Sequence, residues 1–272
     1  MIPYFQIDAI QVGPVTLQMW GILVSSGILL AMYLCYRLAN RYFLSPTLIF
    51  DLGLWAIIGG LIGGRFGHIF FYNFSYYWSR PEEILKFWHG GASSLGGFLG
   101  AAIAIVIFVT WRKLKLKDLW PYLDITSLGL WLGWGVGRIG CFFIHDHPGR
   151  LSNFFLAVNF PNGARHDLGL YESLVAFLLF TLYSLLFKRL IKIRWGLVFI
   201  FSFATYAIAR FFLDFLRATD LPYSDPRYFY LTPAQWGMGM LLAGLTIILI
   251  CSKIMKQKSG TNLDRSYQSI KL

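Results

Sequence analysis

The sequence predicts an all-α integral membrane protein with seven transmembrane helices. Its composition, the length of its apolar runs and the placement of its basic residues are the observations that predict this class. Of 272 residues, 57% are hydrophobic and 14% are charged, and the mean hydropathy is +0.57. Soluble domains carry about 25% charged residues, so this chain has too little polar surface to face water on all sides. A polytopic membrane protein is the class that remains.

Seven apolar runs are long enough to cross a membrane, since one span needs about 20 residues. In chain order they are about 17–39, 48–73, 92–111, 122–143, 168–188, 195–216 and 233–252. The sixteen residues before the first run carry one charge, Asp8, and neither a basic n-region nor a cleavage site, so we expect no signal peptide. Residues 1–252 are treated as one transmembrane domain, and the polar tail 253–272 is expected to be disordered.

The basic residues predict the orientation of the chain. Fifteen of the 24 Lys and Arg lie in the tail, at the end of the first span and in the segments 40–47, 112–121 and 188–194. All of these fall on one side of a seven-span chain, and the positive-inside rule makes that side the cytoplasm. We therefore expect the N-terminus outside and the C-terminus inside. The same placement accounts for most of the net charge of +11 without a nucleic-acid partner.

Small residues recur at helical spacing in two spans. The second span carries Gly59, Gly63 and Gly67, and the fourth carries Gly129, Gly133 and Gly137. Such spacing lets the backbones of neighbouring membrane helices approach closely. We expect tight helix packing at these glycines.

Arginines inside the spans are the first functional signal, because charge within a membrane is costly and points to function. Arg65, Arg138 and Arg210 stand in the outer halves of three spans, and no carboxylate close in the sequence neutralises all three. Their guanidinium groups predict an anion site, and the anion available at that depth is a phospholipid phosphate. The alternative is that each arginine pairs with a carboxylate and only holds the helices together. For Arg217, which lies near Asp214 and Asp220, that alternative is at least as good.

Two helix faces and two outer segments add candidates. Arg65, His68 and Tyr72 share one face of the second span. The sixth span carries a polar stripe formed by Tyr206, Arg210, Asp214 and Arg217. The aromatic segment 74–91 is expected to lie as an arm in the membrane interface.

The polar outer loop 144–167 carries His145, His147 and His166. They suggest either a metal site or general acid–base chemistry. The spacing is weak for a metal site and no thiolate supports it, so we expect acid–base chemistry and no metal. No disulfide framework is expected from Cys35, Cys141 and Cys251.

Four strings identify a family. They are Gly64-Arg65-Phe66-Gly67-His68 with Tyr72-Asn73; Gly90-Gly91-Ala92-Ser93-Ser94-Leu95-Gly96-Gly97; Gly137-Arg138-Ile139-Gly140-Cys141-Phe142-Phe143 with Asp146 and Gly149; and His166 through Leu170-Tyr171-Glu172 with Tyr206, Arg210, Asp214 and Arg217. Gln235 also matches. On these motifs the chain resembles the prolipoprotein diacylglyceryl transferases along almost its whole length.

The resemblance implies a bacterial inner-membrane enzyme that needs no cofactor. It would transfer the diacylglyceryl group of phosphatidylglycerol to the lipobox cysteine of a prelipoprotein signal peptide, forming a thioether while glycerol phosphate leaves. The site would open toward the outer leaflet, where membrane lipids and the signal helix enter sideways. The implied catalytic residues are Arg210, Tyr206, Asp146 and His166. The implied substrate-binding residues are Arg138, Arg65, Tyr72, Gly149, Asp214 and Arg217.

Several positions depart from the family pattern. Leu95 stands where the family usually has His, Cys141 where it has Asn, and Asp146 where it has Glu. Without that histidine, another group must help the substrate thiol to become a thiolate, either one of the loop histidines or the field of the arginines. Two alternatives remain open: a paralogue that uses the phosphate pocket for a different lipid or acceptor, and a non-catalytic lipid-binding or transport protein.

Overall fold

A computed structural model describes residues 1–71, 73–86, 91, 93–221, 224–225 and 227–269, and within this set the side chains of 71, 94–95, 116 and 252–269 are outside the description. The chain forms two compact units. Unit 1 comprises Met1–Ala31 and Ser127–Leu272, and unit 2 comprises Met32–Thr126. The division falls inside two long helices, α1 (Met19–Arg41) and α5 (Leu116–Ile144).

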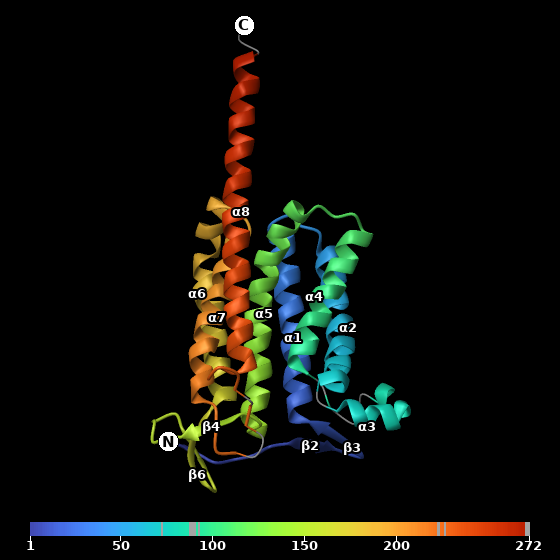
Figure 1. The fold of residues 1–272 in the computed structure, drawn as a ribbon, viewed down its shortest axis with the longest axis vertical. Helices are drawn as coiled ribbons and strands as arrows, with labels where there is room; N and C mark the ends of the chain where they lie inside the picture. Colours follow the sequence, from blue (N-terminus) through green and yellow to red (C-terminus); the bar gives the residue numbers. More distant parts are fainter. Residues whose placement is uncertain (72, 87–90, 92, 222–223, 226, 270–272) are drawn as a thin grey trace. The chain divides into compact units, whose positions relative to one another are not determined.

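Unit 2 is built around the close packing of α2 (Pro46–Phe71) and α4 (Ser94–Trp111), which lie side by side (Figure 1). A Cβ placed on Gly63 would lie 2.4 Å from the carbonyl oxygen of Gly96, and one on Gly59 would lie 2.5 Å from that of Gly100. Only glycine permits backbones to approach so closely. The glycine packing predicted for the second span is therefore confirmed.

The segment after α2 forms the short helices α3 (Phe74–Ser79) and η1 (Pro81–Leu85). The rings of Phe70, Phe74 and Trp78 stack in sequence, with centroids 6.0 and 5.6 Å apart. Trp78 is 78% exposed and Leu85 is 73% exposed. This segment presents the aromatic surface that an interfacial arm requires, and its place in a membrane interface stays a prediction.

Unit 1 contains the helices that carry most of the candidate site. α6 (Leu168–Ile193) packs on α7 (Leu197–Leu213), which ends in η3 (Asp214–Leu216) and packs on α8 (Pro233–Ser269) (Figure 1). The first half of α1 meets the second half of α5 at glycines: a Cβ on Gly133 would lie 2.7 Å from the carbonyl oxygen of Gly27. This contact confirms the prediction of close packing for Gly133.

Strands correct the prediction that the chain is all α. β1 (Ile2–Pro3), β4 (Pro148–Leu151), β5 (Val158–Phe160) and β6 (Gly163–Asp167) form a sheet of order β1-β5-β6-β4, in which β1 runs parallel to β5. β2 (Ala9–Val12) and β3 (Val15–Gln18) form a separate hairpin. The outer loop folds into strands because the turn Pro161-Asn162-Gly163, with Gly163 at φ +108, lets β5 pair with β6. Because the segment 144–167 is polar, the sequence analysis treats it as a loop and does not predict this turn.

The membrane spans agree with the sequence for six runs. Within the described residues, six helices are long and apolar enough to cross a membrane: Met19–Arg41, Pro46–Phe70, Lys117–Ile144, Leu168–Ile193, Leu197–Leu216 and Pro233–Cys251. The run 92–111 corresponds to α4, whose apolar described part is the shorter Gly96–Trp111, so the seventh crossing stays a prediction. α8 continues as helix to Ser269, and the expected disorder of 253–272 also stays a prediction.

Candidate active site

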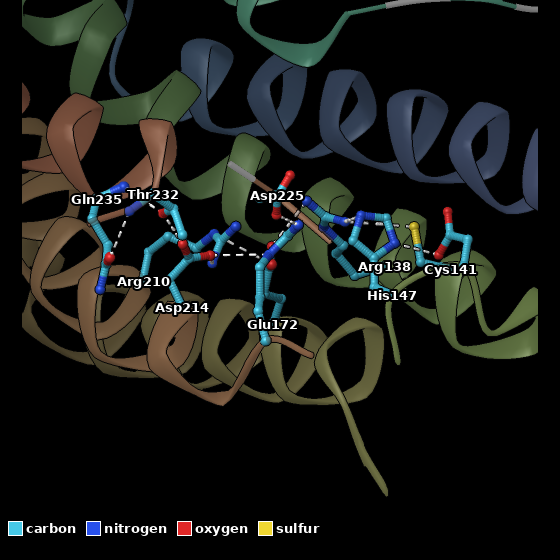
Figure 2. Close-up of polar contacts among 11 residues, drawn as sticks. Arg138, Cys141, His147, Glu172, Arg210, Asp214, Asp225, Thr232 and Gln235 are labelled. Carbon is cyan, nitrogen blue, oxygen red and sulfur yellow. Dashed lines mark hydrogen bonds and ion pairs between the residues drawn. The ribbon is translucent and has the colours of Figure 1, made fainter. Parts of the chain in front are cut away.

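A chain of ion pairs runs through unit 1 where α5, α6 and α7 meet. Its members alternate in charge, in the order Arg138, Glu172, Arg210, Asp214, Arg217 and Asp225, and we call it the ion-pair chain (Figure 2). Glu172 lies 2.9 Å from Nη2 of Arg138 and 3.4 Å from Nε of Arg210. Both carboxylates at its centre, those of Glu172 and Asp214, have side chains that are 0% exposed. Buried charges of this kind persist only when they are paired.

Helical spacing explains half of this arrangement. Arg210 and Asp214 are four residues apart at the end of α7, and Nη1 of Arg210 lies 2.5 Å from Oδ1 of Asp214. Arg217 follows three residues later, with Nε 3.0 Å from the same oxygen. The polar stripe predicted for the sixth span therefore exists, and Asp214 pairs with both arginines. Substrate binding by Asp214 and Arg217 stays a prediction.

The start of α8 holds Asp214 from its other side. The Thr232 hydroxyl donates a hydrogen bond to Oδ2 of Asp214. Gln235 fixes Thr232 in return, because its backbone N–H donates to the threonine hydroxyl oxygen and its side-chain oxygen accepts from the Thr232 N–H. Oδ1 of Asp214 is thus paired with Arg210 and Oδ2 accepts from Thr232, and Figure 2 shows these residues around Asp214.

Aromatic rings flank the arginines. The Arg138 guanidinium carbon lies 4.7 Å from the centre of the Trp134 ring, a cation–π contact. The Tyr206 ring packs against Trp131 with centroids 4.9 Å apart. Arg138 is therefore held between an aromatic face and Glu172, and Tyr206 lies on the same stripe as Arg210. The catalytic role expected for Tyr206 stays a prediction.

A second group of polar side chains lies at the end of α5. Nη1 of Arg138 lies 3.6 Å from Sγ of Cys141 and 3.5 Å from Nε2 of His147. His147 Nδ1 is hydrogen-bonded to Asp146. The structure thus brings the expected catalytic residue Asp146 into the surroundings of Arg138. It also corrects one step of the sequence argument against a metal, because a thiol does lie beside the outer-loop groups.

The other two loop histidines have separate partners. His145 is buried and lies 2.7 Å from Asp167, the residue that caps α6. His166 Nδ1 lies 2.8 Å from the Tyr171 hydroxyl, and partial burial lowers the pKa of His166 below its usual 6.5. A neutral imidazole is the form that accepts a proton near neutral pH. Catalysis by His166 stays a prediction.

Gly149 owes its identity to packing. A Cβ at this position would lie 2.6 Å from the carbonyl oxygen of Leu216 and 2.8 Å from Cβ of His166. Its backbone forms an antiparallel bridge with Arg217. Gly149 thereby lets β4 reach the end of η3, and the direct substrate contact expected for it stays a prediction.

Arg65 belongs to unit 2 and is 3% exposed. Its guanidinium donates to four backbone carbonyls, those of Glu83 (2.5 Å), Ile84 (3.0 Å), Lys86 (3.0 Å) and Gly91 (3.2 Å). These bonds fix the segment that follows α3. The phosphate contact expected for Arg65 stays a prediction, and Tyr72 lies outside the described residues.

Glu172 is the residue that sequence reasoning missed. Only carboxylates close in the sequence were considered as partners of the arginines, and Glu172, which is distant along the chain from both Arg138 and Arg210, pairs with the two of them. A signal was present, because Glu172 is the one acidic residue in the predicted span 168–188. Acidic residues inside spans are rare and face a partner.

Described residues line at least two cavities. One of about 100 Å³ adjoins the site and is lined by Asp146, His147, Pro148, Leu168, Arg217, Ala218, Leu221, Ser224 and Asp225. The larger, about 310 Å³, lies in unit 2 between the ends of α2 and α4 and contacts none of the predicted site residues. The smaller cavity is therefore the one relevant to the site's chemistry.

Comparison with known proteins agrees with the motifs. The sequence profile of the prolipoprotein diacylglyceryl transferases matches residues 8–255. A phosphatidylglycerol–prolipoprotein diacylglyceryl transferase of Nostoc sp. is 30% identical over 255 residues, covering 89% of this chain and 88% of its own. Proteins of the same name from Brucella anthropi and Brucella ovis are each 32% identical, covering 86% and 88% of this chain and 85% and 87% of their own. The chain that carries these buried arginines therefore belongs to the prolipoprotein diacylglyceryl transferase family.

Proposed function

We propose that the chain transfers the diacylglyceryl group of phosphatidylglycerol to the lipobox cysteine thiol of prelipoprotein signal peptides. The observation that carries this proposal is the sharing of Glu172 by Arg138 and Arg210. Glu172 engages Nη2 of Arg138, and Nη1 is directed toward Cys141 and His147. A guanidinium has five N–H donors, so pairing with Glu172, and for Arg210 also with Asp214, orients each arginine and leaves donors for a phosphate.

The chemistry needs such donors on the leaving group. The thiolate forms a C–S bond to the glyceryl carbon of the donor lipid, and the C–O bond to phosphate breaks. The electron pair of that bond goes to the glycerol phosphate, whose growing negative charge Arg138 and Arg210 stabilise. Asp146, with a side chain 35% exposed, and the neutral His166 are the candidates for accepting the thiol proton.

The proposed setting is the bacterial inner membrane, with seven crossings, the N-terminus outside and the site toward the outer leaflet. Six apolar helices and the one-sided basic residues support it. The ends of α5 and α7 that carry the site are opposite to the predicted cytoplasmic segments 112–121 and 188–194.

The test is a transfer assay with purified protein in vesicles of phosphatidylglycerol labelled in the headgroup glycerol. Release of labelled glycerol phosphate that depends on a lipobox peptide with Cys, and not on the matched Ser peptide, supports the proposal. Movement of intact labelled lipid between leaflets without release would favour a transport protein and overturn it.

A second candidate is a paralogous lipid-to-acceptor transferase. Cys141 and Leu95 favour it, since they replace the Asn and His that the resemblance implies. The same assay with phosphatidylethanolamine or cardiolipin vesicles separates the two: release from one of these lipids, with none from phosphatidylglycerol, identifies the paralogue.

A further inference from the structure

The turn that ends α5 depends on a buried histidine. His145 follows Ile144, the last residue of α5, and has a positive φ of 51. This left-handed conformation turns the chain back, as at the C-terminal end of many helices, and brings Asp146 and His147 over the last helical turn. One polar atom of each lies within 4.8 Å of Sγ of Cys141. The place of Asp146, a proposed proton acceptor, is therefore set by the way in which His145 is held.

Aromatic rings pack around the imidazole of His145. The Tyr4 ring stacks on it with centroids 5.2 Å apart. The rings of Phe5, Phe142 and Phe160 lie edge-on to it, with centroids at 5.4, 5.3 and 5.1 Å. The histidine side chain is 1% exposed. Packing of this density leaves a side chain a single orientation, so the ring has a fixed direction in which to form a hydrogen bond.

One nitrogen of this ring carries its hydrogen bonding. Nδ1 lies 2.7 Å from Oδ2 of Asp167, whose side chain is 0% exposed. Because an ionised carboxylate can only accept, Nδ1 of His145 carries the hydrogen. Nε2 is buried and has no hydrogen-bond partner among the described residues. The polar contact that holds His145 in this part of the chain is therefore the one through Nδ1.

Asp167 joins this turn to the helix that carries Glu172. Its second oxygen, Oδ1, accepts the backbone N–H of Leu170 at 3.0 Å and so caps the start of α6. The backbones are joined as well, because the Leu168 N–H donates to the carbonyl oxygen of His147 at 3.1 Å. Glu172 follows in the same helix and pairs with both site arginines. A single carboxylate thus connects the turn after α5 with the helix that orients the arginines.

We propose that His145 and Asp167 form a positioning pair that holds Asp146 in place relative to the two site arginines. Both side chains are buried, and they act through the turn and through α6 without touching a substrate. The motifs that carry the family resemblance do not include His145. The catalytic consequence rests on the proposed function, in which Asp146 meets the thiol while Arg138 and Arg210 hold the phosphate. A displacement of about 1 Å between such groups can lower the rate about 100-fold.

Substitutions at position 145 separate the hydrogen bond from the backbone conformation. Asparagine and glycine both tolerate a positive φ. Asparagine also has a side-chain N–H close to the place of Nδ1, whereas glycine has no side chain. His145→Asn should therefore retain the bond to Asp167, and His145→Gly should lose it. Asp167→Ser removes the same bond from the other side, because serine still caps a helix but has no second oxygen.

The first test follows the turn without either substrate. Asp146 and His147 lie against the buried thiol of Cys141, so displacement of the turn should expose this thiol to N-ethylmaleimide. The full-length protein carries Cys251→Ser, because Cys251 is exposed, and the buried Cys35 in unit 2 is the internal control. Alkylation of each cysteine is measured by peptide mass spectrometry.

We expect Cys141 to be alkylated about tenfold faster in His145→Gly and Asp167→Ser, the effect of one lost hydrogen bond on local opening. In His145→Asn the rate should stay close to that of the parent protein. Cys35 should react equally slowly in every variant, which shows that the fold is intact. Equal alkylation of Cys141 in His145→Gly and His145→Asn overturns the proposal, because the backbone conformation alone would then hold the turn.

The second test measures transfer by the same variants. We expect kcat to fall about 100-fold in His145→Gly and Asp167→Ser, with the KM for phosphatidylglycerol little changed, and His145→Asn to retain most of kcat. An unchanged kcat in His145→Gly, with Cys141 exposed, overturns the positioning role and leaves a structural one. Absence of transfer in the native protein too counts against the proposed function, and the alkylation series then decides by itself whether the pair holds the turn.

Discussion

At the scale of the residue, Glu172 is the centre of the site. It has a fully buried carboxylate and lies between two arginines whose side chains are 16% and 8% exposed. Glu172→Gln leaves both guanidinium groups without this partner, and breaking a buried pair costs roughly 3–5 kcal/mol. We expect a lower unfolding temperature in detergent and a loss of transfer of at least tenfold. The exposed Glu82→Gln is the control, and equal behaviour of the two variants would contradict the account.

A lysine at position 210 tests whether the planar guanidinium group of Arg210 is needed. Arg210→Lys keeps the positive charge but removes the planar set of donors that contacts both Glu172 and Asp214. We expect kcat to fall about 100-fold, the cost of removing one donor to a developing anion. Arg150→Lys, at an exposed position of β4, should leave kcat unchanged. If Arg210→Lys kept its full rate, leaving-group stabilisation by the fork would be wrong.

The lowered pKa of His166 predicts that the stability of the fold depends on pH. Burial lowers its pKa below 6.5, so the unfolded chain binds this proton more readily than the folded one. Its contribution is therefore fully present above pH 6.5 and is lost as the pH falls below that value. Unfolding temperatures measured from pH 5 to 8 should decline less toward acid in His166→Gln than in the native chain. Parallel curves would show that His166 does not titrate in this way.

At the scale of the element, the contact between α2 and α4 depends on glycine. A Cβ on Gly63 would meet the Gly96 carbonyl oxygen at 2.4 Å and the Gly100 Cα at 2.6 Å. One on Gly60 would find its nearest atom at 3.6 Å. We expect Gly63→Ala to lower the unfolding temperature, and Gly60→Ala to leave it unchanged or raise it slightly, because alanine favours helix by about 1 kcal/mol. The opposite order would contradict this packing.

The helices and strands differ in how well the sequence predicts them. Helical runs and the glycine spacing are periodic signals, and six spans and the contacts of Gly63 and Gly133 follow from them. The sheet of β4, β5 and β6 depends on a short turn and on pairing with the distant β1, which local polarity does not reveal. The same limit applies to the site. The stripe of Arg210 and Asp214 is local, whereas the link between Arg138 and Arg210 through Glu172 needs three helices to meet.

At the scale of the whole molecule, orientation is the next prediction. The one-sided basic segments predict that the C-terminus is cytoplasmic. A fluorescent protein that matures only in the cytoplasm should therefore fluoresce when fused after Leu272, and a periplasmic phosphatase fused there should be inactive. An active phosphatase would reverse the topology and move the site to the inner leaflet.

Arg138 and Arg210 are proposed to serve the transfer of a diacylglyceryl group to a thiol. The most direct measurement is mass spectrometry of a lipobox peptide after incubation with the purified protein and phosphatidylglycerol of defined acyl chains. We expect one added diacylglyceryl group on the cysteine sulfur, with none on the matched Ser peptide and none with Arg138→Ala or Arg210→Ala. An unmodified Cys peptide, from folded protein that still binds the lipid, would contradict it.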